Sequence, residues 1–162
     1  MALLALSLLS GCGYHSVASR DPLAGANGVN VAMFANRSYR PGLEGVLARD
    51  LVDELALRTG GRVLSASEAD LELVGTIVSF ASLPVSYTAK DAIKEYKVFI
   101  RVEATLREQR TQKVLWKGDL TGNQSYPVYT QLALQLNAEE AAAAQVCRNL
   151  AEEIWRKIGE RF

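Results

Sequence analysis

The chain has 162 residues, enough for one domain that buries most of its unfolded surface without a disulfide or a metal. It carries 18 Lys and Arg against 18 Asp and Glu, so its formal net charge is zero and the basic excess typical of nucleic-acid-binding proteins is absent. No apolar run in the sequence reaches the length of a membrane-spanning helix.

The chain begins with an apolar segment, Ala2–Leu9, that runs into Leu9-Ser10-Gly11-Cys12. This pattern resembles the lipobox of bacterial lipoproteins, in which the Cys becomes the N-terminus and carries acyl chains. We therefore expect residues 1–11 to be a signal peptide and Cys12 to carry a diacylglycerol and an N-acyl lipid, with no other cofactor. Because no Lys or Arg precedes Arg20, we expect the natural start to lie upstream. The alternative is a short buried strand in which Cys12 is an ordinary core residue.

Residues 12–28 contain Gly, Ser and a Pro and are expected to form a flexible spacer before a single domain at 29–162. Alternating residues predict a strand at 29–34. Pro41 then favours the first turn of a helix, and Gly60-Gly61 ends it. The helix has one apolar stripe, made of Leu43, Val46, Leu47, Leu51 and Leu55.

Three further strands are predicted. Residues 69–81 are apolar on both faces, as in an interior strand, and Pro84 with Thr88–Lys94 is expected to form the following turn. Residues 96–107 alternate strictly, which predicts a long strand with one face on a core and one in water. A charged turn at 107–113 leads to a last strand that contains Val114, Trp116 and Leu120. Its two glycines, Gly118 and Gly122, suggest a bulge or a close backbone approach.

A second helix is predicted to begin at Asn137. Asn137 can cap the helix, and Glu140 three residues later completes a variant of the capping box. Its apolar stripe consists of Ala143, Cys147, Leu150, Ile154 and Ile158. The order strand, helix, three strands, helix predicts an α+β two-layer sandwich, with both helices on one face of a four-stranded sheet.

The residues give no support for an enzyme. His15 is the only histidine and lies in the expected spacer, so a base beside a nucleophile is missing. Cys12, His15 and Cys147 do not form a zinc motif, and no phosphate-binding loop occurs. Cys147 is expected to be a packed core thiol. The helix carboxylates are expected to lie on solvated faces, among them Asp50, Asp53, Glu54, Glu139, Glu140, Glu152 and Glu153.

Basic residues gather in two turns that a meander would place at opposite ends of the sheet. Lys90 and Lys94 flank the first turn, and Arg107, Arg110 and Lys113 lie at the second. These residues are either parts of solvated loops or contacts for phosphate groups of an anionic lipid or a partner, where Lys and Arg form charge-assisted hydrogen bonds.

Several segments, in order and spacing, resemble the LptE family of lipopolysaccharide-assembly lipoproteins. They are Cys12-Gly13-Tyr14-His15, Val31-Ala32-Met33-Phe34-Ala35-Asn36-Arg37-Ser38, Arg40-Pro41-Gly42-Leu43-Glu44, Ala69-Asp70-Leu71-Glu72-Leu73-Val74-Gly75-Thr76-Ile77, Glu95-Tyr96 and Val114-Leu115-Trp116. The resemblance covers about residues 12–158. It implies two helices on a four-stranded sheet and a non-enzymatic lipoprotein, anchored at the periplasmic face of the outer membrane of a Gram-negative bacterium. Gly13 after the lipidated Cys is compatible with that sorting.

The resemblance also implies partners. The domain is expected to plug and assemble an LptD-type β-barrel, whose lumen it fills, and to bind lipopolysaccharide on its way to the outer leaflet. Family members can contact the lipid's phosphates through a basic residue in the turn before the long strand, and Lys90 is the nearest match. Some members have a second basic residue before the last helix, where this chain has the uncharged segment 130–136. Lipid binding is then expected to rest on Lys90, Lys94 or the turn that carries Arg107, Arg110 and Lys113.

Two other functions remain open from the sequence. A lipoprotein that docks as a regulator or scaffold onto a cell-wall synthesis or secretion complex would share the anchor, the spacer and a small α+β domain. A cytosolic protein whose first residues only mimic a lipobox is the third possibility.

Overall fold

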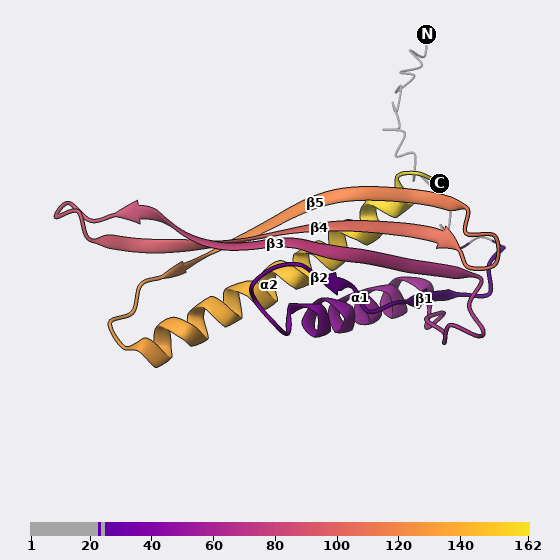
Figure 1. The fold of residues 1–162 in the computed structure, drawn as a ribbon, viewed down its shortest axis with the longest axis horizontal. Coiled ribbons are helices and arrows are strands. Elements are labelled where there is room, and N and C mark those ends of the chain that lie inside the picture. Colours follow the sequence, from indigo (N-terminus) through magenta and orange to yellow (C-terminus); the bar gives the residue numbers. More distant parts are fainter. Residues whose placement is uncertain (1–22, 24) are drawn as a thin grey trace, which may run out of the picture.

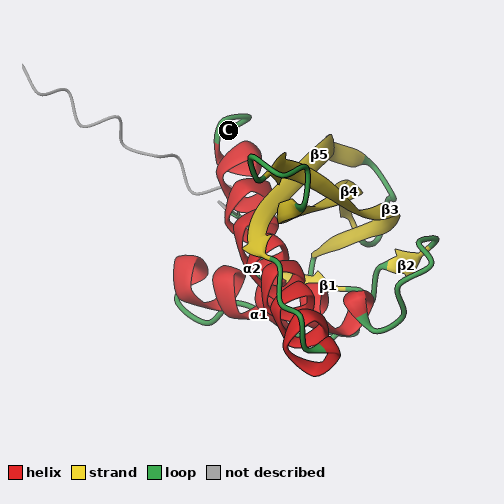
Figure 2. Ribbon diagram, turned by 90° about the vertical axis from the view of Figure 1, so that its left-hand side faces the viewer, coloured by secondary structure: helices red, strands yellow, loops and turns green. Residues whose placement is uncertain are grey.

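The computed structural model describes Leu23 and residues 25–162, so the expected signal peptide and Cys12 lie outside the described residues. A long twisted sheet lies over two helices (Figure 1), and an end-on view shows both helices on one side of the sheet (Figure 2). The elements are β1 (Val29–Val31), β2 (Ala35–Asn36), α1 (Leu43–Thr59), β3 (Leu71–Tyr87), β4 (Ile93–Glu108), β5 (Val114–Pro127) and α2 (Leu132–Gly159). The predicted α+β class and the placement of the helices are confirmed.

The sheet has five strands where four were predicted. Its order is β1-β3-β4-β5, and the two-residue β2 also pairs with β3. The segment predicted as one strand at 29–34 is divided, because Phe34 turns into the core between β1 and β2 and is only 1% exposed. Both short strands run parallel to β3, and α1 supplies the crossover that parallel neighbours require.

The β3–β4 hairpin is longer than the sequence predicted. The pairing runs from Leu71 opposite Glu108 to Tyr87 opposite Ile93. The prediction that Pro84 lies in a turn was therefore wrong. Pro84 lies inside β3, opposite Tyr96. On its other side β3 is paired by β2 only at Thr76 and Ile77, so Pro84 lies on a free strand edge, where its missing N–H costs no ladder hydrogen bond.

The core lies between the sheet and the helices. The inward residues of β4 are Val98, Ile100, Val102, Ala104 and Leu106, each at most 1% exposed. The predicted stripes of both helices are buried, except that Val46 is partly exposed. Leu23 also packs in this core, so the packed part of the chain begins before residue 29.

Asp50 was wrongly expected on a solvated face and is only 7% exposed. It lies on the side of α1 that faces α2. Because α2 packs there, α1 buries residues next to its leucine stripe as well as the stripe itself. Arg49 partly compensates the burial, because its guanidinium donates two hydrogen bonds to Asp50 Oδ1 at 2.8 and 3.1 Å.

The helix ends differ in how well the sequence predicted them. The end of α1 at Gly60 is confirmed, since Gly60 has φ 67° and the Gly61 N–H bonds the Ala56 carbonyl at 2.8 Å. Its start lies two residues after Pro41, because Gly42 adopts φ 87° as the N-cap. α2 begins at Leu132, five residues before the predicted Asn137 cap, in a run of good helix formers.

The glycines of β5 allow close packing, as expected. A Cβ on Gly122 would lie 2.7 Å from Val146 Cγ1 and 3.0 Å from Leu150 Cγ, both on α2. A glycine here therefore lets α2 approach the sheet.

Among the described residues, no helix is both long enough and apolar enough to cross a membrane.

Candidate functional site

The β3–β4 turn presents the first predicted basic pair. The Thr88 N–H bonds the Ala92 carbonyl at 2.7 Å, and the Thr88 hydroxyl accepts the N–H groups of Lys90 and Ala92 at 3.3 and 3.2 Å. Asp91 closes the turn with φ 56°. This backbone arrangement fixes the turn while the Lys90 and Lys94 side chains stay exposed. Neither ammonium group has an ion-pair partner within residues 25–162.

The second basic group lies at the opposite end of the sheet, in and beside the β4–β5 turn (Figure 1). The structure separates its three members. Arg107 is ion-paired with Glu72 across the strands at 2.7 Å, which reduces its availability to a ligand. Arg110 and Lys113 are exposed in the turn and have no ion pair with any described residue. The two basic groups therefore lie at opposite ends of the sheet, as the hairpin topology predicted.

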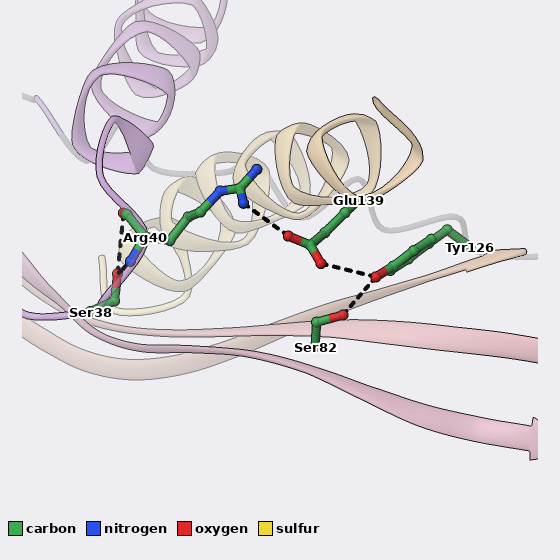
Figure 3. A network of polar contacts seen from close by, with 5 residues as sticks. All are labelled: Ser38, Arg40, Ser82, Tyr126 and Glu139. Carbon is green, nitrogen blue, oxygen red and sulfur yellow. Dashed lines mark hydrogen bonds and ion pairs between the residues drawn. The ribbon is translucent and has the colours of Figure 1, made fainter. Parts of the chain in front are cut away.

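A polar network that the sequence did not predict fixes α2 to the base of the hairpin (Figure 3). Glu139 on α2 accepts a hydrogen bond from the Tyr126 hydroxyl at 3.1 Å and pairs with Arg40 at 3.0 Å. Tyr126 lies on β5, and its hydroxyl is 2.7 Å from Ser82 Oγ on β3. Burial is the main cause that raises the pKa of Tyr126. Glu139 was wrongly placed on a solvated face, because its partners come from distant parts of the sequence.

Aromatic contacts and a small hydrogen-bonded loop support this network. The Arg40 guanidinium lies 5.8 Å from the centre of the Phe80 ring, and Tyr96 stacks on Tyr126 with ring centres 5.8 Å apart. Asn36 donates to the Arg40 carbonyl at 2.9 Å. The loop before α1, the hairpin and α2 are thereby held in one arrangement.

A hollow of about 500 Å³ opens beside this network, where α1 begins next to α2. Arg40 and Arg49 line it together with Leu43, Val46 and Glu140. Both guanidinium groups are already paired, Arg40 with Glu139 and Arg49 with Asp50. Among the described residues that line it, the hollow therefore offers no unpaired cation for an anionic ligand.

Cys147 is buried as predicted and is a free thiol. Burial raises its pKa from 9.0 to about 12, and the Asp50 carboxylate adds to the rise, so the nucleophilic thiolate is disfavoured at neutral pH. Among the described residues, no three His, Cys, Asp or Glu side chains are grouped so that they could hold a metal ion.

Solved structures of low sequence identity share the fold. Rare lipoprotein B from Shewanella oneidensis is 16% identical, with 78% of this chain and 93% of that chain covered and a TM-score of 0.54. A minor lipoprotein from Acinetobacter baumannii is 18% identical, with 83% and 92% covered and a TM-score of 0.51. A hypothetical protein from Chlamydia trachomatis is 10% identical, with 82% and 98% covered and a TM-score of 0.55. At these identities the similarity concerns the fold alone.

A search of curated proteins found no match to this sequence. The family model for LptE, described as lipopolysaccharide-assembly, matches residues 26–158. This range contains all the helices and strands named above, except for Gly159, the last residue of α2. The chain therefore belongs to the LptE family of lipopolysaccharide-assembly proteins.

Proposed function

We propose that this protein is a non-enzymatic outer-membrane lipoprotein that plugs an LptD-type β-barrel and binds lipopolysaccharide during its delivery to the outer leaflet. The observation that carries the proposal is the family match over residues 26–158. In the proposal, acyl chains on Cys12 hold the domain at the periplasmic face of the membrane. Several chains are needed for stable anchoring, because one contributes only marginal binding.

The length of the hairpin supports this arrangement. Val29, where the chain enters the sheet, pairs with Leu71 at the start of β3, and Tyr87 ends β3 beside the turn that carries Lys90. At about 3.3 Å per residue, this strand places the turn about 50 Å from the point of entry. A domain anchored through its N-terminal segment would thus present the turn far from the anchor, where lipid passes through a barrel.

The charges of the turn support lipid binding. Lys90 and Lys94 are exposed and unpaired among the described residues, and phosphate groups form strong charge-assisted hydrogen bonds with ammonium groups. Lipopolysaccharide aggregates are bridged by cations between phosphates. Two ammonium groups at the end of a long hairpin would compete with those cations and loosen the packing of the lipid.

Charge reversal tests which end of the sheet binds lipid. The Lys90→Glu/Lys94→Glu variant should bind immobilised lipopolysaccharide at least about tenfold more weakly, since each hydrogen bond to a charged group contributes about 1.5–3 kcal/mol. The matched control is Arg110→Glu/Lys113→Glu, which reverses two exposed charges at the opposite end. Loss of binding in the control alone would move the site to the β4–β5 turn. Unchanged binding in both variants would remove these basic residues from the proposal.

A further inference from the structure

Exposed apolar side chains are concentrated at one end of the molecule. Of the fourteen large hydrophobic residues that are exposed among those described, eight lie on the end of β3, the loop after β5 and the start of α2. We call these eight the apolar end: Leu83, Val85, Tyr87, Val128, Tyr129, Leu132, Leu134 and Leu136. Figure 1 shows the hairpin turn and the start of α2 at the same end of the fold.

The leucines at the start of α2 are not explained by folding. Leu132, Leu134 and Leu136 are 72%, 45% and 50% exposed. Leu132 and Leu136 are four residues apart and share one face of the helix, whereas Leu134 points to the other side. A helix that packs on a core needs only one apolar stripe, and one that is apolar all round is normally covered. The first two turns of α2 therefore present a surface that a ligand or partner would cover.

The apolar end is fixed beside the basic turn. The Val128 N–H donates to the Lys94 carbonyl at 3.3 Å, which ties the loop after β5 to the strand that carries Lys94. The Tyr129 N–H donates to Gln135 Oε1 at 2.7 Å, which ties the same loop to α2. These two hydrogen bonds therefore hold the start of α2, with its exposed leucines, close to the strand that carries Lys94.

The charge pattern restricts what could cover this surface. Residues 120–138 contain no Asp, Glu, Lys or Arg, and neither do residues 73–89. Five charged residues lie in the turn and the start of β4, and three of them are lysines: Lys90, Asp91, Lys94, Glu95 and Lys97. On α2 the uncharged stretch ends at Glu139, which is paired with Arg40, and at Glu140. Lysines beside a wide uncharged apolar surface match a ligand with anionic groups and aliphatic chains. The lumen wall of a membrane β-barrel is polar and matches this surface poorly.

We infer that the apolar end binds the acyl chains of lipopolysaccharide while Lys90 and Lys94 hold its phosphates. The inference rests on the proposed function, because it names the part of the lipid that a second surface of the same site would bind. The first turns of α2 supply the acyl-chain contact in this chain. Affinity then depends on acylation as well as on charge.

The test compares three probes on the full mature chain: intact lipopolysaccharide, the same lipopolysaccharide with its acyl chains removed, and phosphatidylglycerol vesicles. The wild-type protein should prefer intact over deacylated lipopolysaccharide by more than about tenfold, as expected when aliphatic chains leave water. The Leu132→Gln/Leu134→Gln/Leu136→Gln variant should lose this preference and still bind the deacylated form as the wild type does.

Two further variants keep the test independent of folding. Leu57→Gln, a leucine that is 75% exposed on α1, should keep the full preference. Leu132→Gln alone changes the most exposed of the three leucines and should reduce the preference in part. Equal unfolding midpoints of the variants and the wild type are expected, since all of these side chains lie on the surface.

The results that would contradict the acyl-chain inference differ from the result that would contradict the proposed function. If the triple variant keeps the preference for acylated lipid, the inference is wrong. It is also wrong if the triple variant loses a co-purifying barrel while the preference remains, since the leucines would then contact protein. Wild-type binding to phosphatidylglycerol vesicles as strong as to lipopolysaccharide would assign the surface to the bilayer instead. Wild-type protein that binds no form of lipopolysaccharide would refute the lipid-binding part of the proposed function itself.

Discussion

Replacing Gly122 with alanine tests the packing of α2 on the sheet. The added Cβ would meet Val146 Cγ1 at 2.7 Å and Leu150 Cγ at 3.0 Å. Val146 is fully buried and Leu150 is 2% exposed, so neither side chain has room to move away. The helix must shift from the sheet or the two side chains must leave their preferred rotamers.

The magnitude follows from two opposing effects. Overpacking of a filled core typically costs about 1–3 kcal/mol. Alanine recovers about 0.5–1 kcal/mol, because it loses less conformational freedom on folding than glycine. The net expectation is a loss of up to about 2.5 kcal/mol in the free energy of unfolding, with a central value of about 1 kcal/mol, which is about 0.5 M in urea midpoint for a chain of this size.

The assay is urea-induced unfolding of the purified protein, followed by circular dichroism. Gly45→Ala is the matched control, because Gly45 lies in α1 and a Cβ there has nothing within 4 Å. The same chemical change should raise stability by about 0.5–1 kcal/mol at that helical position. The two variants should therefore shift the midpoint in opposite directions. A Gly122→Ala midpoint raised as much as that of Gly45→Ala would refute the close approach of α2 to β5.

Three further predictions concern the hydrogen bond between Tyr126 and Glu139 and the buried thiol of Cys147. Tyr126→Phe and Glu139→Ala should each lower the free energy of unfolding by about 1 kcal/mol or more, and the double variant should lose less than the sum, because each change removes the same hydrogen bond of 3.1 Å. Strictly additive losses in urea unfolding would show that this contact contributes nothing. Cys147 should resist thiol reagents at pH 8 until the chain is unfolded, with Cys147→Ala as the background control, and rapid labelling of the native protein would contradict its burial. Because its pKa rises from 9.0 to about 12 on folding, the unfolded chain loses the proton first. Stability should therefore fall between those pH values more steeply in the wild type than in Cys147→Ala.

Local patterns predicted the elements whose signals are repeated within one segment. The alternation at 96–107 predicted β4 and its buried face, and the leucine spacing from Leu43 to Leu55 predicted α1. Gly60-Gly61 predicted the end of α1, because the positive φ that closes a helix favours glycine. These features depend on neighbouring residues alone.

Features that depend on distant partners were missed. Glu139 and Arg40 are 99 residues apart, and nothing near either residue indicates their ion pair. Asp50 is buried because α2 covers it, which the α1 sequence cannot show. Pro84 was expected in a turn, because proline is rare inside strands. It fits within β3 only because that part of the strand has no neighbour on its other side, and the local sequence does not show this. The early start of α2 had a local signal, the helix-forming run from Leu132, but the Asn137 capping pattern outweighed it.

The candidate site was predicted in part. The two basic turns followed from hairpin topology, since successive turns of a meander lie at opposite ends of the sheet. The pairing of Arg107 with Glu72 required the strand register, and the apolar end required knowledge of which leucines stay uncovered. The sequence therefore indicated the charges of the candidate site, and the structure adds the exposed apolar surface beside them.

The central claim is that this domain works inside an LptD-type barrel, and the most direct measurement is recovery of the tagged full-length protein from native outer membranes. The account predicts that an LptD-type β-barrel is recovered in a one-to-one ratio and that the pair survives washing. Recovery without a barrel, or with cell-wall or secretion components in its place, would contradict the account and leave the family fold serving a different docking role.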